Sequence, residues 1–283
     1  MGEVASPLSV AAILSKGNDC RERLGCEAMS MGQIHEPEGE EASKKGRSIG
    51  LSADVAHKLR GRLASIAHAA ELLKCYGAEL PLERREKYLD YILDGTKGFS
   101  RLIDDLAWYE KLNSGRLRAT PGTYPLRSLL EDARQLLPEF DSDLRLKVEW
   151  GGPPVDVFLD GCMVAVALSK VLRNAWVYSP PAGEVNLVVQ SEPGLVRVIV
   201  RDHGIGIPAG ELSRIGEPFY RCSNVGEVAG SGMGLAIARA CVVSLGGQIR
   251  IESEPKKGTV VQMSFPWAPS QRHPESFPNN SLA

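Results

Sequence analysis

The sequence predicts an α+β protein in which a pair of long helices precedes a domain that mixes strands and helices. Two observations lead to this class. Between residues 51 and 116, apolar residues recur at every third or fourth position, which is the period of an amphipathic helix. Between residues 120 and 267, short segments rich in β-branched residues are interspersed with helical segments, which is typical of a helix layer packed on a sheet.

The first long helix is predicted from about Leu51, and the segment "YGAELP" ends it with a glycine and a proline. Its apolar stripe consists of Val55, Leu59, Leu63, Ile66, Ala70 and Leu73. The second is predicted from about Leu82 to Asn113, with Gly115 after its end. Its stripe consists of Leu89, Ile92, Thr96, Phe99, Ile103 and Leu106. We expect an antiparallel hairpin at 51–116, which two copies complete as a dimeric four-helix bundle because one hairpin buries its seam poorly.

The second domain is predicted over 120–267 as a two-layer α/β sandwich. Its helical segments are "PLRSLLEDARQLL" and "CMVAVALSKVLRNAWVYS", and its strand segments are "RLKVEW", "EVNLVVQS", "VRVIVRD", "GQIRIESE" and "GTVVQMSFP". Residues 1–50 and 268–283 are polar and weakly patterned, so we expect a flexible arm and a disordered tail and assign them no function.

Composition excludes some classes of function. The formal net charge of −2 gives no basic field, which argues against a nucleic-acid partner. The six cysteines lack zinc-like spacing and are predicted to be reduced thiols. The apolar run "PLSVAAIL" is far shorter than the ~20 residues of a membrane-spanning helix. We therefore expect no membrane span and a cytoplasmic protein.

Two glycine-rich segments are candidates for a nucleotide site. In "DHGIGIP", Asp202 leaves a strand before Gly204 and Gly206, and its carboxylate could accept a hydrogen bond from an amino group such as N6 of adenine. In "GSGMGLAIA", three glycines at 230, 232 and 234 lead into a helix, whose first N–H groups suit a triphosphate. A tight turn and a flexible hinge are the respective alternatives.

Two further polar residues fit the same chemistry. Arg221 lies between the glycine segments, in a stretch that suits a mobile flap, and it could reach a phosphate or remain a solvated surface residue. Asn174 lies on a predicted helix, one turn before Tyr178, and its amide oxygen could bind magnesium. A surface or capping role is the alternative for Asn174.

Taken in order, these segments resemble the ATP-binding domain of sensor histidine kinases, within the wider gyrase–Hsp90–histidine-kinase–MutL ATPase superfamily. "LRNAWVYSP" looks like the asparagine box, "DHGIGIP" the first glycine box, "EPFYR" the phenylalanine box, and "GSGMGLAIA" the second glycine box. "SEPKKGTVVQMSFP" looks like the closing glycine-threonine strand. The resemblance covers roughly residues 51–267.

This resemblance implies ATP and Mg²⁺ as cofactors and a role for each matching residue. Asp202 is expected to bind the adenine amino group, Asn174 to hold magnesium, and Phe219 to anchor the lid. The other expected cofactor-binding residues are Tyr178, Gly204, Gly206, Arg221, Gly230, Gly232, Gly234, Leu235 and Thr259. Two positions depart from the family pattern: Lys170 stands where another asparagine is usual, and Val177 where a basic residue is common.

The segment "LSADVAHKLRGRLASI" resembles the histidine box, and the phosphoacceptor position falls on His57. At about 100° per residue, His57 is rotated about 160° from the stripe residue Leu59, so it should face away from the seam. His68 returns to almost the same face, so periodicity does not choose between the two histidines. The match to the box favours His57, and His68 is interpreted as a surface residue.

The histidine box departs from the family pattern at three positions. Lys58 replaces an acidic neighbour, and although it disfavours protonation of His57, it cannot act as a base. Gly61 replaces a hydroxyl or amide residue that positions water, so we expect weak phosphatase activity. Arg62 replaces a proline, so the helix is expected to run straighter. The flank around Arg60 is the expected docking surface for a receiver domain.

The sequence thus predicts a homodimeric, ATP-dependent histidine kinase. It would transfer the γ-phosphoryl group to His57, with Lys58 and Arg60 beside it, and then to an aspartate of a response-regulator receiver domain. One alternative is a pseudokinase or scaffold that binds ATP and regulates partners by dimerisation. The other is a superfamily ATPase that acts on a protein or nucleic acid.

Overall fold

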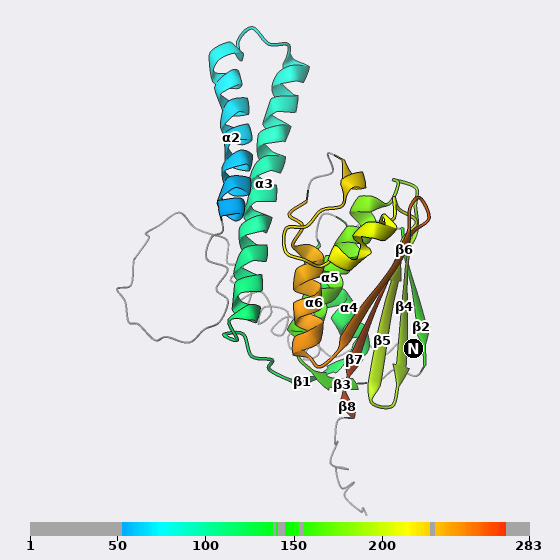
Figure 1. Cartoon of the computed structure of the whole chain (residues 1–283). Helices are drawn as coiled ribbons and strands as arrows, with labels where there is room; N and C mark the ends of the chain where they lie inside the picture. The colour runs from blue at the N-terminus through cyan, green and yellow to red at the C-terminus, as the bar shows by residue number, and fades with distance from the viewer. Residues whose placement is uncertain (1–52, 138–139, 141–144, 153–155, 227–229, 270–283) are drawn as a thin grey trace, which may run out of the picture. The chain divides into compact units, whose positions relative to one another are not determined.

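The computed structural model describes residues 53–137, 140, 145–152, 156–226 and 230–269 (Figure 1). The chain divides into two compact units that do not follow its order. Unit 1 holds the described residues up to Arg118 together with Ser213–Ala240, and unit 2 holds Ala119–Leu212 together with the described residues from Cys241 on. The predicted ranges 1–50, 51–116, 120–267 and 268–283 therefore stay a prediction. Residues 1–50 and most of the predicted tail lie outside the described residues.

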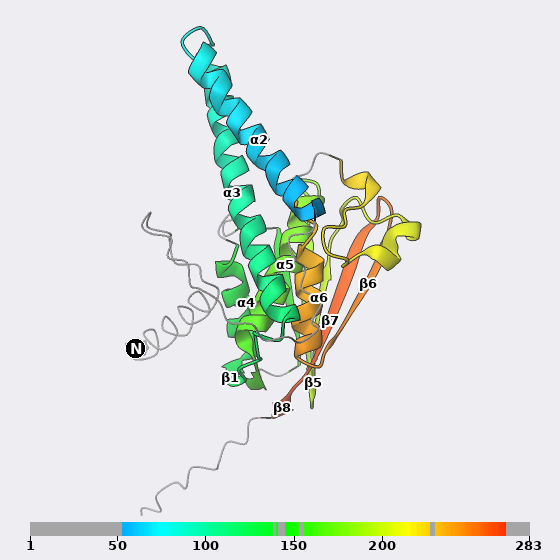
Figure 2. The ribbon, with the colours of Figure 1, turned by 60° about the vertical axis from the view of Figure 1, so that its left-hand side comes forward.

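The predicted helical hairpin is present in unit 1. Helix α2 spans Ala53–Tyr76 and α3 spans Leu82–Asn113, and Figures 1 and 2 show them side by side with opposite directions. Pro81 precedes α3, and Gly115, with a φ of +67°, follows its end. No helix among the described residues is long and apolar enough to cross a membrane. The backbone of residues 53–58 lies in α2, but their side chains lie outside the described part.

The two helices pack through a face that includes glycine. A Cβ added at Gly95 would lie 2.7 Å from Cγ1 of Ile66, so the absence of a side chain at this position lets α2 approach α3 closely. Within one hairpin the packed face includes Gly95 and the buried Leu102, and several residues of the predicted stripes are not covered in the single chain. Large stripe residues left exposed are Leu63 (47%), Leu89 (51%) and Ile103 (47%).

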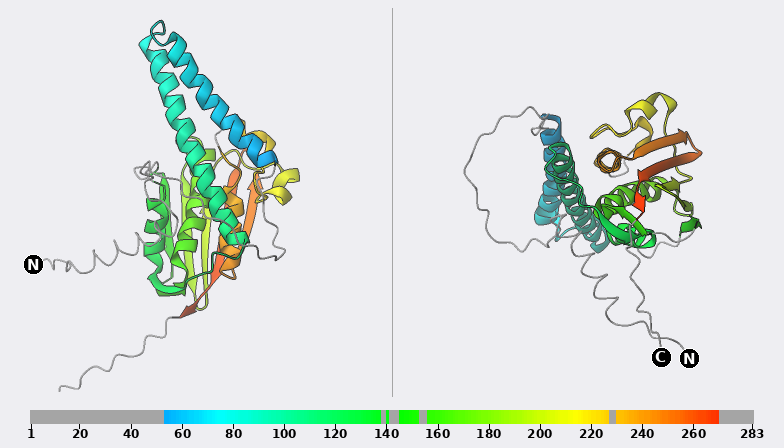
Figure 3. Two further views of the ribbon diagram at one scale, coloured as in Figure 1. Left: turned by 90° about the vertical axis from the view of Figure 1, so that its left-hand side faces the viewer. Right: turned by 90° about the horizontal axis from the view of Figure 1, so that it is seen from below.

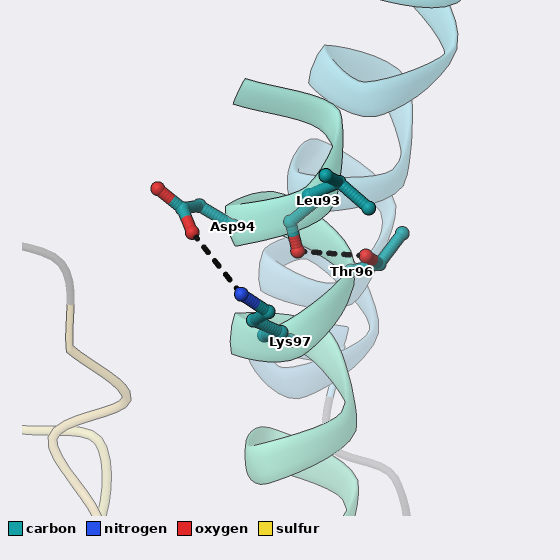
Figure 4. A network of polar contacts seen from close by, with 4 residues as sticks. All are labelled: Leu93, Asp94, Thr96 and Lys97. Carbon is teal, nitrogen blue, oxygen red and sulfur yellow. Dashed lines mark hydrogen bonds and ion pairs between the residues drawn. The ribbon is translucent and has the colours of Figure 1, made fainter. Parts of the chain in front are cut away.

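Thr96 is another exposed member of the predicted stripe. Its hydroxyl donates to the carbonyl oxygen of Leu93 at 2.8 Å, one turn back along α3 (Figure 4). On the same turn, Nζ of Lys97 lies 3.9 Å from a carboxylate oxygen of Asp94. Both of these charged side chains are largely exposed, so the pair contributes little stability.

Unit 2 contains a mixed five-stranded sheet in the order β2-β4-β5-β7-β6. Only the β2–β4 pair is parallel. The strands are β2 (Leu146–Gly151), β4 (Val185–Glu192), β5 (Leu195–Arg201), β6 (Gln248–Glu254) and β7 (Gly258–Pro266). They match the five predicted strand segments. A second sheet, β1-β3-β8, was not predicted; it consists of β1 (Gly122–Pro125), β3 (Asp156–Leu159) and β8 (Ala268–Pro269).

Helices α4 (Leu126–Gln135) and α5 (Gly161–Tyr178) cover one side of the five-stranded sheet (Figures 1 and 3). Alternate residues of β4 and β5 are buried, as a strand with one covered face requires. The α+β class with a helix layer on a sheet is therefore confirmed. The four cysteines in the described part of the chain, at 75, 162, 222 and 241, are free thiols.

A buried carboxylate fixes the start of α5. Asp160 is fully buried, and its Oδ1 accepts from the N–H of Met163 at 3.1 Å. Its Oδ2 accepts from the N–H of Thr120 at 2.6 Å. The side chain thus caps α5 and joins Thr120, near the start of unit 2, to this helix.

The remaining helices lie at or near the boundary between the units in the chain. The short 3₁₀ helix η3 (Ser223–Val225) belongs to unit 1, and η2 (Ala209–Arg214) contains the boundary. Helix α6 (Gly234–Ser244) begins in unit 1 and ends in unit 2.

Candidate functional site

Asp202 is the first residue after β5 and is only 9% exposed. Its N–H donates to the carbonyl oxygen of Thr259 at 2.9 Å, which extends the β5–β7 pairing. Its carboxylate Oδ1 accepts from the N–H of Gly204 at 2.9 Å and from the N–H of Thr259 at 3.1 Å. No donor among the described residues reaches Oδ2. One oxygen therefore holds the carboxylate in place, and the other offers an acceptor to a ligand.

The surroundings of Asp202 change its affinity for a proton. Burial raises the pKa of this carboxyl group above its ordinary value, and the N–H groups of Gly204 and Thr259 and the charge of His203 oppose that shift only in part. The folded state therefore binds this proton more tightly than the unfolded state does. Because of this, the contribution of Asp202 to stability is lost as the pH rises through the raised pKa.

Three glycines let the chain close around Asp202. A Cβ at Gly204 would lie 2.5 Å from the carbonyl oxygen of Tyr178. Gly206 has a φ of +65°, and its Cβ would lie 2.0 Å from the carbonyl oxygen of Glu254. Gly258 has a φ of +99°, and its Cβ would lie 2.0 Å from the carbonyl oxygen of Asp202 itself. Each clash would be with backbone, so no side chain can be accommodated without moving the chain.

Thr259 makes two contacts around Asp202, and its expected role as a ligand contact stays a prediction. Its N–H orients Asp202, while its hydroxyl lies 2.9 Å from Oγ of Ser253. The Ser253 hydroxyl also accepts from the N–H of Ile207 at 2.9 Å. Sequence reasoning missed Ser253 and Gly258. The glycine before a strand was a usable signal, whereas a serine within an alternating strand gives none.

Asn174 and Tyr178 lie on the partly exposed face of α5. The residues of α5 from Gly161 to Ser169 are all buried. In the rest of the helix one side is partly exposed, and its residues are Lys170, Arg173, Asn174, Val177 and Tyr178. The Asn174 side chain makes no hydrogen bond with any described residue. Its amide oxygen is thus available, as a metal ligand must be. Tyr178 contacts the first glycine box through its carbonyl oxygen, which accepts from the N–H of Ile205 at 3.2 Å.

Unit 1 holds the phenylalanine box and the second glycine box, and their backbones lie in contact. Phe219 has a φ of 64°, unusual for a residue with a side chain. Gly232 has a φ of +74°, and its Cβ would lie 2.7 Å from the carbonyl carbon of Phe219. The Arg221 guanidinium donates to the carbonyl oxygens of Gly230 at 3.5 Å and Gly226 at 3.4 Å. The two boxes, separated in sequence, are thus brought together.

The start of α6 presents three unpaired donors. The carbonyl oxygen of Met233 accepts from the N–H of Ile237 at 2.9 Å, so Met233 is the residue before the helix. The next three N–H groups, of Gly234, Leu235 and Ala236, have no acceptor among the described residues. Donors at the positive end of a helix dipole favour an anion such as phosphate. The predicted roles of Gly234 and Leu235 are chemically reasonable here but stay predictions.

The histidine box lies on α2. The side chains of His57 and Lys58 lie outside the described part, so the outward orientation of His57 stays a prediction. Arg60 and His68 are exposed. A Cβ added at Gly61 would meet no atom within 4 Å, so this position has open space around it.

Comparisons with known proteins identify the ATP-binding segment. Residues 163–269 match the family described as "Histidine kinase-, DNA gyrase B-, and HSP90-like ATPase". The chain is 29% identical over 229 residues to the "signal transduction histidine-protein kinase/phosphatase MprB" of Mycolicibacterium paratuberculosis, a match that covers 79% of this chain. It is 26% identical to the "histidine protein kinase DivJ" of Caulobacter vibrioides, over 80% of this chain. The chain is a relative of the sensor histidine kinases.

This relationship confirms the resemblance inferred from the sequence boxes, and the prediction of an ATP-dependent histidine kinase agrees with the relatives' names. The chain spans 43% of the MprB relative and 38% of the DivJ relative, less than half of either. Among solved structures, histidine kinase ThkA in complex with the response regulator TrrA matches with a TM-score of 0.62 and 20% identity. That match covers 92% of this chain and 67% of ThkA, and it establishes similarity of fold.

The substitution Gly206→Ala in this protein tests the glycine packing around Asp202. We expect a loss of at least about 2 kcal/mol of unfolding free energy, because the new Cβ needs a left-handed backbone and meets a carbonyl oxygen. Gly210→Ala is the matched control, since no atom lies within 4 Å of its added Cβ. Urea denaturation of both variants provides the measurement. Equal stability of the two would contradict the packing described here.

Proposed function

We propose that this protein is a histidine kinase that transfers the γ-phosphoryl group of ATP to His57 and then to an aspartate of a receiver domain. The observation that carries the proposal is the carboxylate of Asp202. It is buried, fixed through Oδ1 by two backbone N–H groups, and left with Oδ2 as an acceptor. An amino group such as N6 of adenine is the complementary donor. The relatives' names supply the reaction class.

Other predicted ligand residues fit the remaining parts of Mg²⁺-ATP. The unpaired N–H groups at the start of α6 and the guanidinium of Arg221 suit phosphate oxygens. Asn174 would hold Mg²⁺ through its amide oxygen, together with phosphate oxygens and water, as this hard cation prefers. When bound, Mg²⁺ neutralises phosphate charge during transfer. Lys170, where the family has a second asparagine, would add a positive charge on the same face of α5.

The phosphoryl step requires a neutral imidazole. Nε2 of His57 forms a bond to the γ-phosphorus while the bond from phosphorus to the β–γ bridging oxygen breaks, and ADP leaves with that electron pair. The neighbouring cation Lys58 favours neutral His57 but cannot accept the Nδ1 proton of the product, which must pass to solvent. Phosphoryl transfer depends mainly on positioning and electrostatic stabilisation, so we expect a slow reaction and not a lost one.

The partners follow from the same proposal. A receiver domain would dock near the exposed Arg60 on α2, and a response regulator is the partner with which ThkA was solved. A second copy of the chain would cover the exposed apolar residues of the hairpin, which include Leu63, Leu89 and Ile103. A cytoplasmic location and the absence of a nucleic-acid partner complete the proposal.

A second candidate function is an ATP-binding pseudokinase that acts through dimerisation. The residues that favour it are the departures from the family pattern at Lys58, Gly61, Lys170 and Val177. This candidate predicts nucleotide binding without phosphorylation of His57, so the two experiments on Asp202 and His57 below distinguish the two functions.

The adenine contact can be tested with Asp202→Asn. The amide oxygen can keep both backbone hydrogen bonds, but the amide nitrogen replaces the free acceptor, so ATP affinity should fall about ten- to a hundredfold. Isothermal titration with Mg²⁺-ATP provides the measurement. Unchanged ATP affinity would exclude this role of Asp202.

The Asp202→Asn variant should also lose one component of the pH dependence of unfolding free energy, which urea denaturation at several pH values measures. Wild-type stability should decrease as the pH rises between the ordinary aspartate pKa of about 4 and the raised pKa of Asp202.

The phosphoacceptor can be tested with His57→Gln. Incubation of the wild type with γ-labelled ATP and Mg²⁺ should give an acid-labile, base-stable label, because a phosphoramidate bond is hydrolysed by acid. The His57→Gln variant should show no label, whereas His68→Gln should be labelled as strongly as wild type. Labelling of His57→Gln would remove the assignment, and ATP binding without any labelling of wild type would favour the pseudokinase.

Gly61 predicts weak phosphatase activity because it offers no side chain to orient water. The MprB relative is named a kinase/phosphatase, so weak phosphatase activity would distinguish this protein from it. Since space around Gly61 is open, a hydroxyl can be added without a clash, and Gly61→Thr should raise the rate of receiver dephosphorylation about tenfold or more. The assay follows loss of phosphate from a phosphorylated receiver. Fast dephosphorylation by the unmodified protein would refute the prediction.

A further inference from the structure

The glycine run at residues 230–233 is bonded to the helical hairpin at two points, all within unit 1. Nη2 of Arg62, on α2, donates to the carbonyl oxygen of Gly230 at 2.8 Å. The hydroxyl of Ser231 donates to Oδ2 of Asp105, on α3, at 2.9 Å. Both bonds involve a charged partner, which makes them stronger than bonds between neutral groups. Residues more than a hundred positions apart in sequence are joined in this way.

The bond to Asp105 continues to the start of α6. Asp105 is 7% exposed, so its carboxylate is largely removed from water on the packed face of the hairpin. The Ser231 hydroxyl that donates to Asp105 also accepts from the N–H of Met233 at 3.2 Å. Met233 immediately precedes the three unpaired N–H groups of α6. The hydrogen bonds therefore run from α3 through Ser231 to the end of the run that presents those donors.

The hydrogen bond from Arg62 to Gly230 depends on the absence of a side chain at Gly98, on α3. A Cβ at Gly98 would lie 3.1 Å from Nη1 of Arg62, so this glycine leaves room for the guanidinium to cross the helix. Arg221 donates to the same carbonyl oxygen of Gly230, at 3.5 Å. Burial, followed by the nearby charges of Arg221 and Arg101, lowers the pKa of Arg62 below its ordinary value.

We propose that Arg62 and Asp105 are positioning residues that order the run Gly230–Met233, and with it the phosphate-binding start of α6, before nucleotide arrives. The inference rests on the proposed function for its consequence in ATP binding. A run with glycines at 230 and 232 loses much conformational entropy when it becomes ordered. Hydrogen bonds that already hold the run remove part of this loss from the binding step, so affinity increases.

Arg62 is one of the departures of the histidine box from the family pattern, which has a proline at this position. A proline has no side-chain donor. The hairpin that carries His57 would therefore also set the conformation of the phosphate end of the nucleotide site, through a residue five positions after His57.

Hydrogen–deuterium exchange on the full, nucleotide-free chain tests the ordering directly. In Arg62→Ala and in Asp105→Asn, amides in peptides covering residues 230–236 should exchange about tenfold faster than in wild type. Arg62→Lys should restore part of the protection, because lysine keeps a charged donor without the fork of arginine. Arg84→Ala and Asp90→Asn are matched controls on exposed positions of α3 and should exchange as wild type does. Circular dichroism checks that every variant keeps its helix content.

Titration with Mg²⁺-ATP tests the consequence. Arg62→Ala should raise the Kd about tenfold, while the rate of His57 labelling at saturating ATP should change less than twofold. Unchanged exchange at residues 230–236 in both variants would overturn the inference, and so would tighter ATP binding, because the contacts would then block the site. A wild type that binds no nucleotide would instead remove the proposed function, while the exchange result would still decide whether the contacts order the run.

Discussion

The geometry of the candidate adenine site depends on one constraint, the fixed carboxylate of Asp202. A buried carboxylate needs hydrogen-bond donors, and here the donors are backbone N–H groups of Gly204 and Thr259. These groups can reach one oxygen only because the loop after β5 and the start of β7 come very close together. Gly258 permits this approach, since a Cβ there would overlap the backbone of Asp202. The glycines are therefore part of the carboxylate's environment.

A second consequence concerns affinity for a ligand. The two bonds to Oδ1 and the raised pKa oppose each other, since hydrogen bonds favour the charged form and burial disfavours it. A donor from a ligand at Oδ2 would favour the charged form further. The buried carboxylate therefore gains stability when a ligand donates a hydrogen bond to Oδ2. A ligand with a complementary amino group is favoured in this way over one without a donor.

The hairpin has a packed face and an exposed apolar face. One face packs α2 on α3 and includes the carboxylate of Asp105, while other apolar residues of α2 and α3 are exposed in the single chain. Arg62 and Asp105 connect the packed region to the glycine run. The departures in the histidine box therefore do not all point to lost activity. Arg62 has a partner in the folded chain, whereas Gly61 has open space around it.

The sequence alone determined the α+β class, the hairpin, the five strands of the large sheet and the resemblance to sensor histidine kinases. Each of these depends on local period or on short motifs, which a single segment contains. It did not predict the small β1-β3-β8 sheet, because those strands of two to four residues carry no clear alternation. It also did not show that Gly95 lies where α2 and α3 approach closely, since periodicity counts apolar residues and does not register the space left by a glycine. Only the tertiary structure decided that Gly258 and Ser253 support Asp202 and that Arg62 and Asp105 hold the glycine run. Those contacts join residues far apart in the chain, and their energies arise from distances that no local pattern contains.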